Sequence, residues 1–179
     1  MIKKDDYALV LDYLTHGYPM EGNMKPVVQA IGLTHLSLLE LAPMRGVQIE
    51  IKEKVYIGSE KRDKIYYIIG RLRTEKLTET AKIQLQEFVN SFVGEREQEF
   101  VKFFNNASAI NTRLHQLELL PGFGKKHTQE VLEVRNEKQF DSFDEIKQRV
   151  KSVPDPKKAI EKRILEELTE NPRQRLFVY

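Results

Sequence analysis

The stretch Leu120-Pro121-Gly122-Phe123-Gly124 constrains this chain more than any other, because it requires a sharp turn at a defined place. Two glycines one residue apart let the backbone reverse and adopt positive φ without a steric penalty. Lys125 and Lys126 follow directly and open a predicted helix. The first N–H groups of a helix have no intrahelical partner and lie at the positive end of its dipole. The stretch therefore predicts a phosphate-binding turn in front of a helix.

Capping residues predict the helices around this turn. Asn111 or Thr112 can cap a helix that carries Leu114 and Leu117 into the turn, and the helix after the turn is expected to bury Val131. Further on, Ser142 has the spacing of a capping box with acids in the first helical turn, which predicts a helix through Val150.

A second turn is predicted at Pro154-Asp155-Pro156, where Asp155 can cap a helix and Pro156 suits its first position. Ile160 and Ile164 give this helix a buried face. The basic residues Lys157, Lys158, Lys162 and Arg163 lie largely off that face. We expect Lys157 and Lys158 to hold a second phosphate near the first.

The first turn resembles the helix-hairpin-helix motif of sequence-independent nucleic-acid-binding proteins. Leu117 and residues 120–124 fit the pattern, and Thr128 occupies a position where that motif usually has Ala. With the second, degenerate hairpin, the resemblance implies an all-α tandem helix-hairpin-helix domain over residues 106–179. Contacts of this kind are made to the nucleic-acid backbone, so they imply little sequence preference.

The N-terminal residues 1–76 are rich in short β-patterns. Residues 7–14 are apolar enough for a buried strand, and Val47, Ile49 and Ile51 alternate with polar residues as in a half-buried strand. Residues 55–57 and 65–69 flank a polar turn and are expected to pair as a hairpin. We expect a small OB-like β-barrel, giving an α+β protein of two domains. The tyrosines Tyr56, Tyr66 and Tyr67 are either base-stacking residues or ordinary strand aromatics.

Residues 77–105 change to a helical period and are expected to connect the two domains. Apolar residues from Ala81 to Val93 share one face, with Thr78 as a cap and Gly94 as a stop. A shorter helix around Phe100 and Phe104 follows.

Composition excludes some chemistry and leaves other options open. The net charge is only +2, but residues 52–76 and 147–175 each carry four more basic than acidic residues, so either could hold a polyanion.

The chain has no cysteine, and its four histidines lack metal-ligand spacing, so we expect no metal and no cofactor. Without an apolar leader or a membrane-spanning run, a cytoplasmic location is expected.

The whole chain also resembles an uncharacterised archaeal family that is predicted to bind RNA and that joins an OB-like domain to a helix-hairpin-helix domain. Four stretches carry this resemblance: residues 8–14, 55–58, 103–105 and 113–122. It implies the two-domain architecture and favours RNA as the partner.

Three functions are compatible with these patterns. The preferred one is non-catalytic binding of a nucleic-acid backbone. The second is a DNA glycosylase/lyase in which Lys126 forms a Schiff base and Asp144 is the accompanying acid. The third is a protein-interaction module in a ribosome or repair complex.

Overall fold

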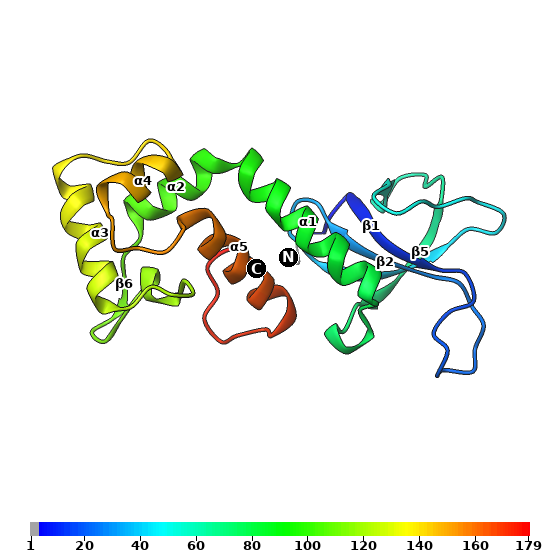
Figure 1. The fold of residues 1–179 in the computed structure, drawn as a ribbon. Helices are drawn as coiled ribbons and strands as arrows, with labels where there is room; N and C mark the ends of the chain where they lie inside the picture. The colour runs from blue at the N-terminus through cyan, green and yellow to red at the C-terminus, as the bar shows by residue number, and fades with distance from the viewer. Residues whose placement is uncertain (1–3) are drawn as a thin grey trace. The chain divides into compact units, whose positions relative to one another are not determined.

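The computed structural model describes residues 4–179 and contains both β and α structure (Figure 1). Its larger sheet is antiparallel, with the strand order β4-β1-β2-β3-β5. These strands are β1 (Tyr7–Leu14), β2 (Val27–Gly32), β3 (Leu38–Pro43), β4 (Lys54–Tyr56) and β5 (Ile65–Arg71). A smaller sheet pairs β6 (Ala109–Asn111) with β7 (Leu114–His115). The fold class is therefore mixed α+β, as expected.

Five α-helices follow the larger sheet within the described residues. They are α1 (Glu79–Glu95), α2 (Glu97–Asn106), α3 (Lys125–Glu137), α4 (Phe143–Arg149) and α5 (Pro156–Thr169). Two short 3₁₀ segments, η1 (Thr74–Lys76) and η2 (Gln116–Leu119), complete the regular structure. Three predicted caps are confirmed. The side chains of Thr78, Ser142 and Asp155 accept the N–H groups of Ala81, Glu145 and Lys158 at 3.0, 3.0 and 3.1 Å.

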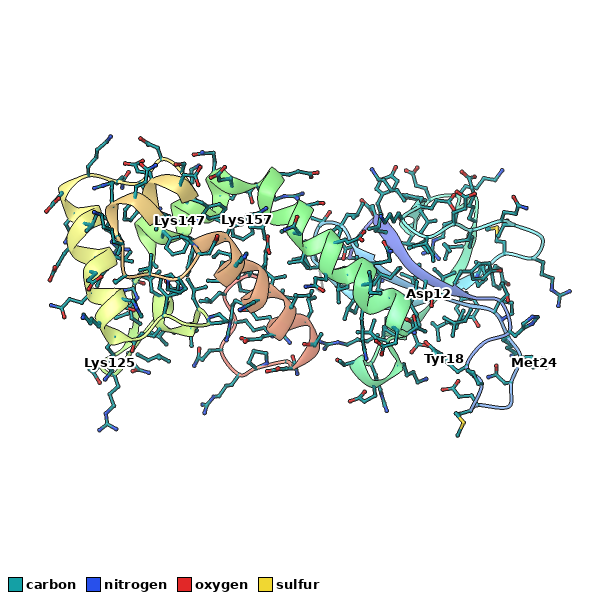
Figure 2. All side chains as sticks on the ribbon, viewed as in Figure 1. Asp12, Tyr18, Met24, Lys125, Lys147 and Lys157 are labelled. Carbon is teal, nitrogen blue, oxygen red and sulfur yellow. The ribbon has the colours of Figure 1, made fainter. Side chains whose placement is uncertain are left out.

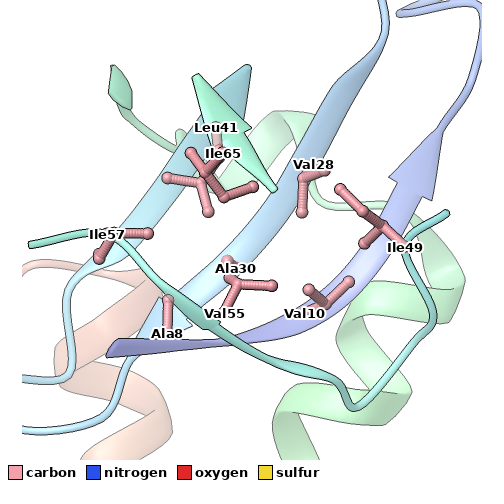
Figure 3. Packing of buried hydrophobic residues seen from close by; sticks show 9 residues of the cluster. All are labelled: Ala8, Val10, Val28, Ala30, Leu41, Ile49, Val55, Ile57 and Ile65. Carbon is pink, nitrogen blue, oxygen red and sulfur yellow. The ribbon is translucent and has the colours of Figure 1, made fainter. Parts of the chain in front are cut away.

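The five-stranded sheet curls around one apolar core. Nine buried side chains form this core, and Figure 3 shows how they gather: Ala8, Val10, Val28, Ala30, Leu41, Ile49, Val55, Ile57 and Ile65. They include Val55 of β4 and Ile65 of β5, although these strands occupy opposite ends of the strand order. Both edges can reach the same core because the sheet is curled, as the twist of strands allows.

Two predictions for this sheet were wrong. Residues 47–51 form no strand; only Ile49 of the three alternating residues is buried, and Lys52 turns the backbone with a φ of 70°. Strands β4 and β5 also do not pair as a hairpin, because β4 pairs with β1 and β5 pairs with β3. Each short strand adds to a free edge of the sheet, and the curl then brings Ile57 and Ile65 into one core.

The chain divides into two compact units. The first contains the described residues up to Glu87 together with Leu168–Tyr179, and the second contains Phe88–Glu167. Leu176 and Val178 are buried, so the C-terminal tail packs against the protein. In the first unit, the Thr74 hydroxyl donates to the carbonyl of Thr169 at 2.8 Å.

The helix expected ahead of the glycine turn is absent. Leu114 lies in β7, and residues 116–119 form the single 3₁₀ turn η2. His115 caps this turn, since its Nδ1 accepts the N–H of Leu117 at 3.1 Å while its own N–H donates to Glu118 at 2.7 Å. Burial lowers the pKa of His115, as does the charge of Arg135, and the neutral ring is the form that accepts this hydrogen bond.

Arg163 also departs from the prediction, because it is buried rather than on the outer face of α5. The residue is 7% exposed, and its Nε donates to the carboxylate of the fully buried Glu167 at 3.0 Å. A charged side chain can be buried when an opposite charge one helical turn away pairs with it.

Candidate functional site

The first turn is anchored by its apolar residues. Leu117, Leu120 and Phe123 are all buried, and the Phe123 ring lies 6.0 Å from that of Phe104. Two backbone hydrogen bonds close the turn: Leu120 N–H donates to Leu117, and Phe123 N–H donates to Leu120. The glycines Gly122 and Gly124 remain exposed. The turn therefore presents its backbone to solvent on a fixed base.

Gly122 brings the two predicted turns together. Its φ is +84°, a conformation that disfavours any side chain. A Cβ at this position would lie 3.1 Å from Cγ of Pro154, which belongs to the second turn. The first turn thus needs glycine both for its backbone conformation and for its contact with the second turn.

The N-terminus of α3 is open. Gly124 precedes the helix and has no side chain to cap it. His127 Nδ1 accepts the N–H of Gly124 itself, at 3.2 Å. No side chain in residues 4–179 caps the N–H groups at the start of α3, so these donors and the helix dipole face solvent.

Lys125 and Lys126 add positive charge to this end of α3. Both side chains are exposed, and neither forms an ion pair with an acid in the described chain. The first turn of α3 contains no acidic residue. The open N–H groups and both lysines can therefore act on the same anion.

The second turn differs, because a carboxylate occupies the N-terminus of α5. Asp155 accepts the N–H of Lys158 at 3.1 Å and lies 3.5 Å from Nζ of Lys147. Burial raises the pKa of Asp155, but the hydrogen bond from Lys158 and the charge of Lys147 outweigh burial and hold the pKa below its ordinary 3.8. The negative charge satisfies this helix end from within the protein.

The predicted site lysines of the second turn are also arranged differently from those of the first. Lys157 pairs with Glu161 at 3.6 Å, and its Nζ lies near Gly94 of α1. Figure 2 shows Lys157 well apart from Lys125. Lys158 is exposed. Residues 120–126 therefore lie together at the first turn, whereas Lys157 lies apart from them and is paired with Glu161.

The residues of the lyase alternative are both on the surface. Lys126 and Asp144 are exposed, and Asp144 lies in the first turn of α4, where acids favour the helix dipole. A Schiff-base lysine is activated by desolvation or by neighbouring cations. Lys125 is a neighbouring cation in the sequence, but the exposure of Lys126 provides no desolvation.

Much of the excess charge in residues 52–76 is paired. Lys52 pairs with Glu87, Lys64 with Glu53, and Lys76 with Glu21. Lys54 lies over the ring of Tyr7, with its Nζ 4.2 Å from the ring centroid. Three of the eight basic side chains in this stretch are therefore already paired with acids, and a fourth lies over an aromatic ring.

A groove of about 1050 Å³ in the first unit was not predicted from the sequence. It lies beside β3 and β5 and is lined by Tyr13, Tyr18, Tyr66, Tyr67, Lys25 and Arg45, among others. The sequence predicts Tyr66 and Tyr67 to be either base-stacking residues or ordinary strand aromatics, but the loop residues around them carry no pattern that indicates a groove.

The comparisons with known proteins give the family. A model described as "Protein of unknown function (DUF655)" matches residues 4–179. The chain belongs to this family. It is 41% identical over 177 residues to Uncharacterized protein MJ0038 of Methanocaldococcus jannaschii, covering 99% of this chain and 80% of that protein. It is also similar to the crystal structure of Af1531 from Archaeoglobus fulgidus, with a TM-score of 0.83, 39% identity, and coverage of 98% of this chain and 100% of that one.

These relatives confirm that the family is uncharacterised and has archaeal members, as the resemblance in the sequence implies. Within residues 4–179, no helix combines the length and the apolar character that crossing a membrane requires.

Proposed function

We propose that this protein is a non-catalytic, largely sequence-independent nucleic-acid-binding protein that holds the phosphate backbone at the turn before α3. The observation that carries the proposal is the uncapped N-terminus of α3, with two exposed glycines before it and two unpaired lysines in its first turn. Helix N-termini of this kind bind phosphate through N–H groups, dipole and charge together. RNA is the favoured partner, because the chain resembles a family predicted to bind RNA.

The proposal includes the architecture. The curled sheet is taken as an OB-like domain, and the turns before α3 and α5 as a tandem helix-hairpin-helix. The contact between Gly122 and Pro154 supports two associated hairpins, although η2 replaces the first helix of the motif.

Within this interface, the first turn is the main phosphate site. Lys158 supplies a nearby exposed cation, while Lys157 contributes less because it already pairs with Glu161. Asp155 repels a phosphate at the second turn. The two hairpins therefore act as one strong and one weak contact.

Binding of fluorescently labelled RNA and DNA, single-stranded and double-stranded, measured by anisotropy at low salt, tests the proposal. We expect binding to every class with little sequence preference. The logarithm of the affinity should fall linearly with the logarithm of salt concentration, by about 0.7–0.9 per phosphate contact. Undetectable binding to the whole panel would refute the proposal.

Two sets of variants locate the site. Lys125→Glu with Lys126→Glu changes exposed side chains only, so it should fold normally while reducing affinity and the salt slope. Lys102→Glu with Lys162→Glu makes the same change of charge at exposed positions of α2 and α5 and serves as the control. Replacing Gly122 and Gly124 together should weaken binding more than Lys125→Ala does. If the first charge reversal and its control have equal effects, the phosphate site lies elsewhere.

A further inference from the structure

The groove in the first unit contains two consecutive tyrosines of one strand. Side chains alternate between the two faces of a regular strand, so Tyr66 and Tyr67 of β5 would normally diverge. Here the pairing of β3 with β5 shifts: Ala42 faces Tyr67 and Pro43 faces Ile65, so Tyr66 has no partner residue on β3. Bulges redirect side chains in this way. Both tyrosines consequently line the same groove.

These tyrosines are presented to solvent. Tyr66 is 69% exposed and Tyr67 is 48% exposed, and their rings meet edge to face with centroids 5.4 Å apart. Ile69 of the same strand also lines the groove and is 48% exposed. Two aromatic rings fixed on a strand and left open to solvent can each accept a flat partner at little entropic cost.

Two basic side chains line the groove near one end of the sheet. The register of β2 with β3 pairs Gln29 with Glu40 and Val28 with Leu41, so the start of β2 and the end of β3 lie at the same end of the sheet. Lys25 and Arg45 line the groove just beyond that end. Both are exposed, and neither pairs with an acid in residues 4–179.

The two acids that line the groove are already engaged: Glu40 lies in β3, and Glu21 lies in the exposed loop before β2. Glu40 accepts the hydroxyl of Tyr18 at 3.2 Å, and both Glu21 and Glu40 pair with Lys76, at 2.6 and 3.9 Å. Burial raises the pKa of Tyr18 to about 12, with Glu40 adding to the effect, so its hydroxyl remains a donor. The cations at the open end are therefore the ones available to a ligand.

We propose that this groove binds single-stranded nucleic acid, with unpaired bases stacked on Tyr66 and Tyr67 and with the backbone held by Lys25 and Arg45. The inference rests on the proposed function and adds the class of nucleic acid. Aromatic platforms beside unpaired cations suit a strand whose bases are free, whereas a duplex keeps its bases stacked on one another. A groove of about 1050 Å³ has room for more than one nucleotide.

The test compares a single-stranded RNA with the same sequence in a duplex, using the full chain. Tyr66→Ala with Tyr67→Ala should lower single-strand affinity about tenfold or more and leave duplex affinity unchanged. Tyr179→Ala removes a tyrosine that is 87% exposed outside the groove and should change neither affinity. The chain has seven tyrosines and no tryptophan, so quenching of its intrinsic fluorescence by the single strand reports stacking. The double variant should lose that quenching.

The outcomes separate this inference from the proposed function. If the tyrosine variant keeps both the single-strand affinity and the fluorescence quenching of the wild type, the groove does not bind single-stranded nucleic acid. A groove that binds a peptide instead would give this result. If the lysine reversal at residues 125 and 126 leaves both affinities intact while the tyrosine variant no longer binds the single strand, that result supports single-strand binding in the groove and refutes phosphate binding at the turn before α3. If wild-type protein binds neither RNA at low salt, both fail.

Discussion

The turns before α3 and α5 have similar sequences but opposite electrostatics at their helix ends. Each precedes a helix with lysines in its first turn, and Gly122 of the first contacts Pro154 of the second. Yet α3 begins after a glycine and leaves its N–H groups open, while α5 begins after Asp155, whose carboxylate accepts one of them. Lysine content therefore does not distinguish the proposed phosphate site from the second turn. The capping residue distinguishes them, because Gly124 leaves the positive end of α3 open while Asp155 satisfies that of α5.

The largest effect is expected from the buried ion pair between Arg163 and Glu167 within α5. Glu167→Gln removes the fully buried carboxylate that accepts the Nε–H of Arg163, which should lower the free energy of unfolding by about 3–5 kcal/mol. Glu166→Gln is the matched control: Glu166 also lies beside Arg163, at 3.6 Å, but its side chain is 38% exposed, so a loss below about 1 kcal/mol is expected. Denaturant unfolding measures both. Equal losses of unfolding free energy in the two variants would show that the burial of Glu167 does not determine the strength of its pair with Arg163.

Gly122→Ala tests the conformation of the first turn. A side chain at φ +84° costs about 1–2 kcal/mol, and its Cβ would press on Pro154. We expect a loss of about 1–3 kcal/mol in the free energy of unfolding. Gly124→Ala is the control, since Gly124 has negative φ and open space where a methyl group would lie, so its stability should change little while phosphate binding weakens. A stable Gly122→Ala protein would contradict the contact between the turns.

Asp155→Asn keeps an oxygen that can cap α5 but removes its negative charge. The N-terminus of α5 then resembles that of α3 in having no carboxylate. The free energy of unfolding at neutral pH should fall by about 0.3–1 kcal/mol, and affinity for nucleic acid at low salt should rise. Anisotropy measures the affinity, and a decrease would indicate that Asp155 does not oppose phosphate.

The same variant carries a pH signature. Because the folded-state pKa of Asp155 lies below 3.8, its stabilising contribution is complete above that value and is lost as the pH falls through the folded-state pKa. Part of the acid-induced loss of stability should therefore be missing in the Asn variant, as measured by unfolding at a series of pH values.

Thr128 gives the smallest expected effect. It is buried in α3, and its hydroxyl has no hydrogen-bond partner among residues 4–179. Thr128→Val keeps the shape and removes the unsatisfied hydroxyl, so the free energy of unfolding should rise by up to about 1 kcal/mol. Thr128→Ala also loses a methyl group and should gain less. A clear loss with Val, in thermal or denaturant unfolding, would mean that the hydroxyl is satisfied in solution.

The local features of the second unit were predictable. The caps at Ser142 and Asp155, the burial of Val131 and Ile160, and the sharp turn at Gly122 depend on residues close in sequence. The helix expected before that turn was not found, because Leu114 pairs in a small sheet and His115 caps a 3₁₀ turn instead. That outcome depends on pairing with a neighbouring strand, which the capping pattern of Asn111 and Thr112 does not reveal.

By itself, the sequence determined where the backbone must turn and which helix end carries no carboxylate: Gly122, Gly124, Lys125 and Lys126 specify the candidate phosphate site through short-range chemistry. Only the tertiary structure decided that Arg163 is buried against Glu167, that β4 and β5 add to opposite edges of one curled sheet, and that Tyr66 and Tyr67 share a groove. The physical reason is that burial, strand pairing and bulges depend on residues distant in sequence, whereas a glycine turn or a helix cap depends on its immediate neighbours.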